Sequence, residues 1–334
     1  MTANKNKVTA SDVAKLAGVS KWTVSRAFMP EASVSASARE RVMAVARELG
    51  YRPNLLARSL AKKKTNIIGV VIDEMKNPHT LMLIDEATRQ LQSRGYMALI
   101  LNISANAHHQ SVMTQADQLQ VDGILFLATI LSQELIRLAE DIYRVPLVQL
   151  CRHTSSNGID VIASDAMSAG EQMAELLIAQ GFRRFGYMAG PTTPLSHTFR
   201  KEGYAAGLAK AGLKIDVMLD AGSYNREMGW KTLQDYLELT PAEARIDALL
   251  CENDVLALGA MAARQKLAPE WHPGIAGFDD IEEASAPDWQ LTSYNQRIDK
   301  LVHEALNRLI EGRASSDNSW QRGQLCIRRS HLKV

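Results

Sequence analysis

A short segment near the N-terminus carries side chains that could contact DNA. Lys21, Trp22, Ser25 and Arg26 fall on the outward side of a predicted helix, and Trp22 and Arg26 are four residues apart, hence on one face. An arginine in the major groove can donate two hydrogen bonds to one guanine, and hydroxyls suit phosphates or base edges. The alternative is a solvated helix face without a ligand.

A second set of polar residues could hold a small ligand. These residues follow apolar runs that we predict to be buried strands, and in an open α/β sheet a ligand binds at the carboxyl ends of the strands. They are Asp73, Asn77, Asn102, Arg152, Asn253, Asp254 and Asp279. Arg200, in SHTFRKEGY, begins an amphipathic helix. Arginine with Asp and Asn suits a polyhydroxylated ligand, because each hydroxyl both donates and accepts. Asp254 and Asp280 could instead cap the helices that follow them.

Catalytic and metal-binding patterns are missing from the sequence. It contains no G-x-x-x-x-G-K-[ST], G-x-G-x-x-G, G-x-S-x-G or H-E-x-x-H string. The eight histidines are scattered, and His108 and His109 are adjacent, so they project from different sides of a helix. We therefore expect no enzyme activity, no cofactor and no metal site.

The segment that carries Lys21 and Arg26 is strongly basic. Residues 1–65 hold 13 Lys and Arg against four Asp and Glu, a net charge of +9, whereas residues 66–334 have a net charge of −8. A basic head on an acidic body indicates that the head binds a polyanion. Its apolar pattern argues against an unstructured basic tail.

Three short helices are predicted to position these side chains. Thr9 and Asp12 mark the start of the first helix, whose apolar stripe is Val13, Leu16 and Ala17. Gly18 ends this helix, and Ser20 caps the second. The second helix places Val24, Ala27 and Phe28 inward, and a third begins at the pair Ser37 and Glu40, with Val42, Val45, Ala46 and Leu49 as its stripe. The first two helices form a helix-turn-helix candidate.

The remaining chain alternates strands and helices. Continuous apolar runs occupy 67–72, 96–103, 122–129, 145–150, 183–190, 247–253 and 274–280. Runs that do not alternate with polar residues are typical of strands buried on both faces, so we predict an α/β body with parallel sheets. With some 270 residues, two sheets are favoured over one.

The 334 residues include no apolar run long enough to span a membrane and no signal-peptide core. The three cysteines, Cys151, Cys251 and Cys326, are far apart in the sequence, which suits a reducing compartment. We therefore predict a cytoplasmic protein. No membrane partner is expected.

The head resembles the lactose/galactose-repressor (LacI/GalR) family. The string DVAKLAGVSKWTVSR, followed by GYRPNLLARSLAKKKTNIIGVV, carries the resemblance, which is close over residues 8–72. It implies that Lys21, Trp22 and Arg26 read operator bases. It also implies that backbone-contacting or supporting positions are held by Thr9, Ser20, Thr23, Ser25 and Tyr51. The chain departs from the family at Met29-Pro30, where an Asn is usual, which puts one phosphate contact in question, and Trp22 is bulkier than the common residues at its position.

Residues 53–65 follow the head as a hinge. Eight residues from Asn54, a plausible cap, to Ala61 are too few for a stable helix in water. The resemblance implies that two copies fold in the minor groove, with Leu60 as an apolar wedge. A flexible linker is the alternative.

The body, by the same resemblance, is similar to a periplasmic sugar-binding protein with two Rossmann-like lobes. We expect a DNA-binding domain at 1–52, a hinge at 53–65, and an effector-binding and dimerisation domain at 66–334. Lobe one is expected at about 66–162 and 294–323, and lobe two at about 163–293 and 324–334. The effector positions implied are Ser196, Arg200, Asn253, Asp279 and Gln296, with Tyr224 as an aromatic wall; Asp73 and Arg152 are our further candidates from the strand ends.

Arg152 stands where the family often has an acidic residue, so a cation beside Arg200 would favour a sugar acid or sugar phosphate. The alternative is that Arg152 lies on the surface. The basic helix-turn-helix head and the sugar-binding body together predict a sequence-specific transcriptional regulator, a repressor. We expect it to bind double-stranded operator DNA as a homodimer and to respond to a small sugar or sugar-acid effector. The helix around 78–94 and the segment 107–120 are the expected dimer face. The alternative is a cytoplasmic sugar-binding protein without DNA function.

Overall fold

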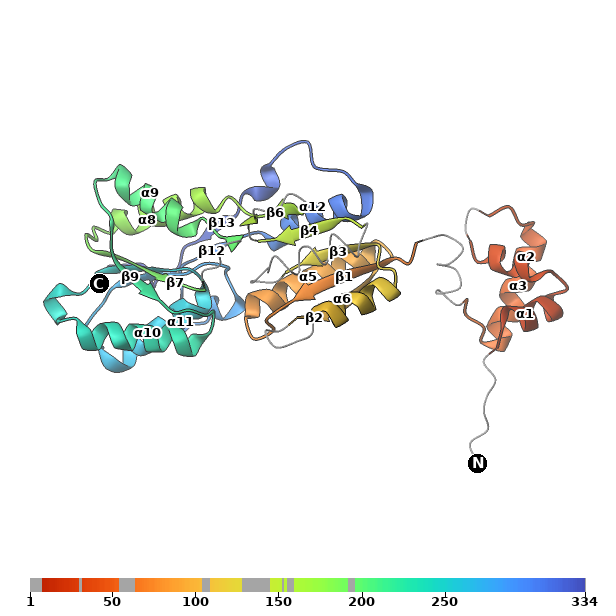
Figure 1. Cartoon of the computed structure of the whole chain (residues 1–334), viewed down its shortest axis with the longest axis horizontal. Helices are drawn as coiled ribbons and strands as arrows, with labels where there is room; N and C mark the ends of the chain where they lie inside the picture. Colours follow the sequence, from red (N-terminus) through yellow and green to blue (C-terminus); the bar gives the residue numbers. More distant parts are fainter. Residues whose placement is uncertain are drawn as a thin grey trace, which may run out of the picture. The chain divides into compact units, whose positions relative to one another are not determined.

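The computed structural model describes residues 8–29, 32–53, 64–103, 109–127, 145–151, 153–154, 159–191 and 196–333. The chain divides into two compact units, Met1–Thr65 and Asn66–Val334 (Figure 1). The predicted hinge residues Asn54 and Leu60 lie outside the described residues, so the hinge helix stays a prediction.

The first unit is built from three helices with capped ends. They are α1 (Ala10–Ala17), α2 (Lys21–Ala27) and α3 (Ala36–Leu49). Gly18 ends α1 and Gly50 ends α3, both in the left-handed region with φ of 64° and 65°. Glycine occupies that region without steric cost, so each helix stops there and the chain can turn.

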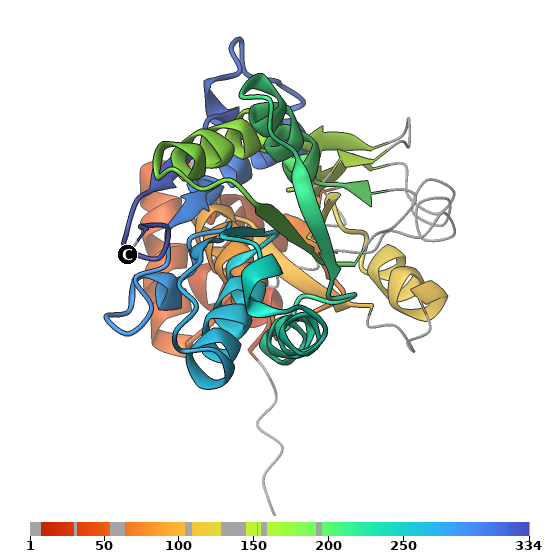
Figure 2. The ribbon, with the colours of Figure 1, turned by 90° about the vertical axis from the view of Figure 1, so that its left-hand side faces the viewer.

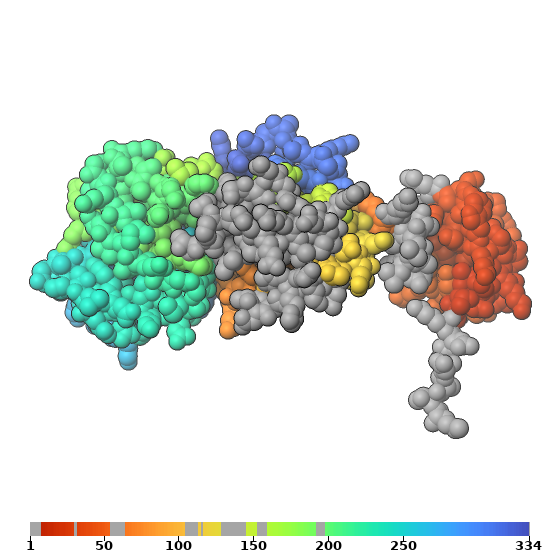
Figure 3. All heavy atoms as spheres, viewed as in Figure 1, coloured from red at the N-terminus to blue at the C-terminus, as the bar shows by residue number. Residues whose placement is uncertain are grey.

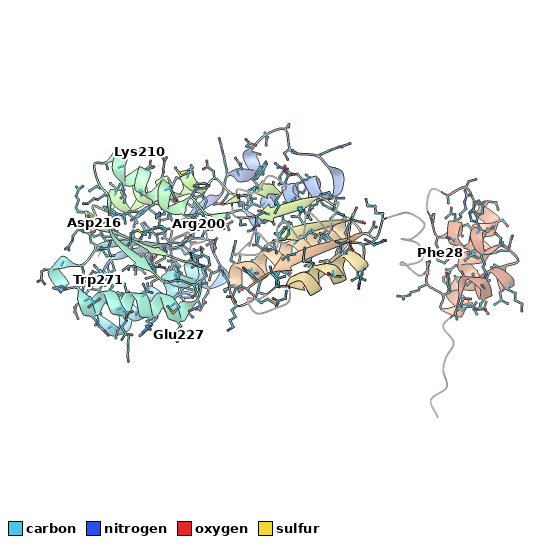
Figure 4. All side chains as sticks on the ribbon, in the orientation of Figure 1. Phe28, Arg200, Lys210, Asp216, Glu227 and Trp271 are labelled. Atoms are coloured by element: carbon cyan, nitrogen blue, oxygen red, sulfur yellow. The ribbon has the colours of Figure 1, made fainter. Side chains whose placement is uncertain are left out.

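The three helices bury one small core between them. Val13, Val24 and Val42, one from each helix, are fully buried, and alanines surround them. Phe28 (labelled in Figure 4) meets Tyr51 edge to face at 5.8 Å between ring centroids. The helix-turn-helix prediction is confirmed.

Two local predictions in this unit are wrong. Leu16 is 64% exposed, because the inward face of α1 carries Ala14 in its place. The third helix begins at Ala36 rather than at Ser37, since the Ser35 hydroxyl accepts a hydrogen bond from the backbone N–H of Ala38 at 3.3 Å.

The second unit contains a first parallel sheet in the order β2-β1-β3-β4-β6. Its strands are β1 (Ile67–Ile72), β2 (Met97–Asn102), β3 (Gly123–Phe126), β4 (Leu147–Leu150) and β6 (Asp160–Ile162). On one face of this sheet lie α5 (Pro78–Ser93) and α12 (Ile298–Glu311), which share a core with it. On the other face lies α6 (His109–Gln118).

A second parallel sheet in the same unit has the order β11-β10-β7-β9. Its strands are β7 (Phe185–Ala189), β9 (Ile215–Asp220), β10 (Ala248–Cys251) and β11 (Gly274–Ala276). Helices α8 (Ala166–Ala179) and α9 (Arg200–Lys210) cover one face, and α10 (Arg226–Leu239) and α11 (Asp254–Leu267) the other (Figure 2). Residues of this part form a continuous mass of packed side chains, green to cyan in Figure 3.

Short antiparallel pairs join distant segments of the second unit. They are β12 (Ser293–Asn295) with β13 (Gln324–Cys326), and β5 (His153–Thr154) with β8 (Ser196–His197). The remaining elements in the described part of this unit are single 3-10 turns: η1 (Ala242–Ala244), η2 (Glu282–Ser285) and η3 (Ser319–Gln321). After β13 the chain returns to the second sheet, where the Ile275 N–H donates to the Ser330 carbonyl at 2.8 Å.

The predicted fold class, a helix-turn-helix head and an α/β body with parallel sheets, is confirmed. Each apolar run named above contains one strand of the two sheets. The prediction missed the edge strands β6 and β9, because their outer face is exposed and their sequence therefore mixes polar and apolar residues.

Candidate functional site

The outward face of α2 presents polar and aromatic side chains. Lys21, Trp22 and Ser25 are exposed, Trp22 by 66%. The guanidinium carbon of Arg26 lies 4.1 Å from the centroid of the Trp22 ring, so the two side chains stack as a cation–π pair. The prediction that Trp22 and Arg26 share one side of the helix is thus met.

Ser20 and Thr23 form the start of α2. The Ser20 hydroxyl accepts a hydrogen bond from the Thr23 N–H at 3.1 Å, and the two hydroxyls lie 2.9 Å apart. At the start of α1, the Asp12 carboxylate accepts from the backbone N–H and the hydroxyl of Thr9 at 2.9 and 2.8 Å, and these bonds lower the pKa of Asp12. Thr9 itself is exposed, whereas Tyr51 is partly buried, and burial raises the pKa of its phenol.

Arg39 ties α3 to the chain that leaves α2. Its guanidinium donates to the carbonyls of Ala27 at 2.5 Å, Met29 at 2.9 Å and Ala32 at 3.0 Å. Three carbonyls on one planar fork fix the end of α2 against the third helix. Sequence reasoning missed this role, because nothing in the spacing of Arg39 separates it from the solvent-facing arginines of the same helix.

A pocket in the second unit collects residues from both sheets. We call each sheet, with the helices and loops packed on it, the first-sheet part and the second-sheet part. The second-sheet part contributes Thr198, Arg200, Tyr224, Asn253 and Asp279. The first-sheet part contributes Asn77, His79, Thr80, Leu83, Leu127, Leu150 and Cys151. The pocket therefore has a polar wall on one side and a mixed wall on the other, which is how sites for polar small molecules are built.

Arg200 is held at the start of α9, inside the unit (labelled in Figure 4). Helix α9 lies so close to α8 that a Cβ at Gly170 would come within 2.5 Å of the Arg200 carbonyl, which makes glycine necessary there. The Arg200 guanidinium donates to the Glu252 carbonyl at 2.5 Å and to the Asp279 carboxylate at 3.2 Å. Its flat side lies 3.8 Å from the centroid of the Phe278 ring. Burial works to lower the pKa of Arg200, but the Asp279 carboxylate raises it overall, so the group stays charged.

Asp279 is the centre of a buried hydrogen-bond network. Besides Arg200, it accepts a bond from the Gln296 amide at 2.7 Å, and Gln296 in turn accepts one from the Ser164 hydroxyl at 2.9 Å. His79, from the first-sheet part, lies 3.9 Å from the other Asp279 oxygen. The backbone of Asp279 has φ of 107°, an unusual conformation for a non-glycine residue. Such strain is typical of functional positions.

Three neighbouring polar side chains, Glu252, Asn253 and Asp254, serve the framework of the pocket. Glu252 accepts from the Gly190 N–H at 2.5 Å and from the Thr198 hydroxyl at 2.9 Å. Asn253 caps α11 by accepting from the Leu256 N–H at 3.0 Å. Asp254 is fully buried and accepts from the Ile281 N–H and the Ser293 hydroxyl at 2.9 and 2.6 Å. Burial raises the pKa of Asp254 well above its ordinary value.

The predicted ligand residues are only partly brought together. Arg200, Tyr224, Asn253 and Asp279 line the pocket, and Gln296 adjoins it through Asp279. Asp73 does not line this pocket. Arg152 and the side chain of Ser196 lie outside the described residues.

Sequence reasoning missed His79, Thr80 and Thr198 as pocket residues. A signal for the first two was present, because Asn77-Pro78 marks a helix start directly after a buried strand, and Asn77 does cap α5 by accepting from the His79 N–H at 3.1 Å. Within the described ranges, no group of three His, Cys, Asp or Glu side chains could hold a metal ion. Every helix described here is too short or too polar to span a membrane.

Two family models match the sequence. The one described as "Bacterial regulatory proteins, lacI family" matches residues 9–54, and the one described as "Periplasmic binding proteins and sugar binding domain of LacI family" matches residues 65–275. The first covers the three-helix unit, and the second covers most of the unit that holds the pocket.

Similar proteins span nearly the whole chain. The ribose operon repressor of Escherichia coli K12 is 30% identical over 95% of this chain and 96% of its own length. The transcriptional repressor CytR of the same organism is 30% identical over 93% of this chain and 92% of its own. The crystal structure of the Lac repressor dimer bound to operator and the anti-inducer ONPF superposes with a TM-score of 0.84 at 25% identity, covering 98% of this chain and all of that one.

Proposed function

Because this chain belongs to the LacI family of bacterial regulatory proteins, we propose that the outward face of α2 reads operator DNA and that the pocket around Arg200 and Asp279 binds the effector. The chain is a DNA-binding transcriptional regulator of the repressor type, with a sugar-binding domain of that family. The same match disfavours a ligand-binding protein without DNA function.

The observation that carries the DNA-contact proposal is the exposed α2 face. Lys21, Ser25 and Trp22 with its stacked Arg26 stand on a helix that is capped at its start by Ser20 and fixed at its end by Arg39. A rigid helix with exposed donors and a net charge of +9 over residues 1–65 suits a major groove. Thr9, Thr23 and Tyr51 support this face by holding the starts of α1 and α2 and the Phe28 contact.

We also propose that the chain acts as a homodimer. One three-helix unit buries too little surface for a tight specific complex, so two units reading two half-sites are expected. Exposed large apolar side chains around the first sheet include Leu81 on α5, by 47%, and Met97 and Ile100 on the edge strand β2, by 53% and 40%. The structurally similar Lac repressor is a dimer on its operator.

Selection from a randomised duplex pool tests the DNA-contact proposal. The full chain should enrich a near-palindromic sequence, and Arg26→Ala should lose most of its preference for that sequence over random duplex. The matched control is Lys210→Ala (Lys210 is labelled in Figure 4), since Lys210 pairs with Glu171 in the other unit at 2.7 Å. If Arg26→Ala selects as sharply as the wild type, the proposed contact face is wrong.

The effector we propose is a small polyhydroxylated compound such as a sugar. Arg200, Asn253 and Tyr224 offer donors and acceptors, and each ligand hydroxyl needs both. Asp279 already neutralises Arg200, so the described part of the pocket has no uncompensated cation to attract an anion. We therefore favour a neutral sugar on the strength of the described residues; the sugar-acid prediction rests on Arg152, which lies outside them.

A thermal-shift screen of the full chain separates these effector classes. A ligand at 100 times its Kd adds about 2.7 kcal/mol of stability, so a neutral sugar should raise the Tm by several degrees, while its matching sugar acid should not. Asp279→Ala should abolish the shift. A larger shift with the acid would overturn the neutral-ligand proposal.

We further propose that the protein has no catalytic role, needs no cofactor and works in the cytoplasm, where bacterial DNA lies. The support is its relatedness over nearly its full length to repressors. Turnover of any bound sugar would contradict this.

A further inference from the structure

The stacked pair on α2 has an unusual composition for a DNA-facing surface. Trp22 exposes 66% of its surface, although an indole ring has only one hydrogen-bond donor and no acceptor. The Arg26 guanidinium lies over this ring at 4.1 Å rather than extending freely into solvent. The tryptophan therefore has an immediate structural consequence, which is the orientation of Arg26.

Arg26 keeps its hydrogen-bonding capacity in this arrangement. No carboxylate among the described side chains forms an ion pair with Arg26. Arg39 in the same unit, by contrast, donates hydrogen bonds to three carbonyls. Stacking occupies the face of the guanidinium, and the N–H groups lie in its plane. Both donors needed for the O6 and N7 atoms of a guanine thus remain available.

We propose that Trp22 is a positioning residue for base recognition, holding the Arg26 guanidinium in the orientation that reads a guanine in the major groove. An arginine stem has several rotatable bonds, and a side chain that is already oriented loses less rotamer freedom on binding. Trp22 then contributes to specificity through Arg26, and not only through surface contact. This inference rests on the proposed function, namely that the α2 face reads DNA.

The experiment uses the full chain and a duplex that the wild type selects from a randomised pool. Each guanine in that duplex is replaced in turn by 7-deazaguanine, which lacks the N7 acceptor. The guanine read by Arg26 is the one whose replacement weakens the wild type but not Arg26→Ala. The ratio of Kd values on the 7-deaza and normal duplexes at this position is then measured for Trp22→Leu and Trp22→Phe.

We expect a wild-type ratio of about five or more, in line with one good arginine–guanine contact. Trp22→Leu should reduce it to below about two-fold, because leucine is apolar but has no aromatic face, while Trp22→Phe should retain most of it. Trp22 is exposed, so equal melting temperatures of the three proteins are expected and confirm that each is folded.

Two outcomes would overturn the inference. One is a Trp22→Leu protein that loses affinity equally on both duplexes and keeps the wild-type ratio, which would make Trp22 a plain contact. The other is that no guanine depends on Arg26. If the wild type selects no sequence at all, the proposed function fails first and takes the inference with it.

Discussion

The Arg200 guanidinium lies 3.2 Å from the Asp279 carboxylate, and both side chains are buried, at 8% and 4% exposure. The two residues are far apart in the chain, one at the start of α9 and the other after β11. Each is a charge that could not remain at this depth alone. The pair therefore forms part of the polar wall of the proposed effector pocket without any ligand.

Breaking this pair should destabilise the second unit. Arg200→Met leaves Asp279 buried without its cation, and breaking a buried pair typically costs about 3–5 kcal/mol. Urea unfolding of the full chain should show this as a lower midpoint. The control is Arg226→Met, because Arg226 and Glu283 form an exposed pair at 3.0 Å whose loss should cost less than about 1 kcal/mol. Similar small losses in both variants would contradict the role given to Arg200.

Asp254 should make the protein less stable as the pH rises. Burial raises the pKa of Asp254 well above its ordinary 3.8, so above pH 3.8 the folded chain binds a proton that the unfolded chain has lost. The free energy of unfolding then falls by up to about 1.4 kcal/mol per pH unit until the folded-state pKa is reached. Asp254→Asn removes this pH dependence, so its free energy of unfolding relative to that of the wild type should rise from pH 4 upward. Parallel pH profiles for the two proteins would refute the assignment.

Asp280 should behave in the opposite way. Burial works to raise its pKa, but hydrogen bonds from Arg328, Asn295 and Cys326 outweigh this and lower it. Its stabilising contribution is therefore present above pH 3.8 and is lost as the pH falls through the lowered pKa. Asp280→Asn should be less stable than the wild type at neutral pH, and the difference should shrink in acid. A stability difference between the two proteins that widens in acid would contradict this prediction.

Arg39 should stabilise the DNA-binding unit out of proportion to its charge. Arg39→Ala removes three hydrogen bonds to carbonyls around the end of α2 and should cost about 1–3 kcal/mol in that unit. Arg41→Ala on the same helix removes an equal charge and one exposed bond to Ser37 at 2.9 Å, so it should cost little. Hydrogen exchange of the α2 amides compares the two variants. Equal exchange rates in Arg39→Ala and Arg41→Ala would argue against the proposed role of Arg39 in fixing the end of α2.

Gly190 should be required for the position of Tyr224. A Cβ at residue 190 would come within 2.5 Å of the Cζ atom of the Tyr224 ring, so Gly190→Ala must displace that ring. We expect a stability loss of about 1–3 kcal/mol from overpacking, together with weaker effector binding. Adding Tyr224→Leu should restore the Tm without restoring effector binding. Normal effector affinity in Gly190→Ala would show that Tyr224 does not line the working pocket.

The sequence was sufficient for the strands of both sheet interiors and for the capped start of α2. The run at 67–72 coincides with β1, because a strand buried on both faces must be apolar throughout. Strand β9 escaped detection because every second residue, as at Asp216, faces solvent. Leu16 shows the limit of periodicity: Ala14 and Leu16 flank the buried Val13–Ala17 line of α1 on opposite sides, and only packing decides which flank is covered.

The pocket was predictable in its strand-end residues and not in its second wall. Arg200 and Asp279 were found because each begins or follows a recognisable element. His79 and Thr80 come from the other sheet, and no local pattern states that α5 will begin opposite Asp279. The ion pair between Asp279 and Arg200, which sets the net charge that a ligand meets, likewise forms only in the tertiary structure.

The most direct test of the account is the Kd of the full chain for its selected duplex, measured with and without a saturating ligand that raises the Tm. Coupling between two sites in one protein is typically about 1–3 kcal/mol, which corresponds to roughly a 5-fold to 150-fold change in affinity. We predict a change of this size, in either direction. A ligand that binds the pocket and leaves the duplex Kd unchanged would contradict the claim that the pocket controls the DNA-binding unit.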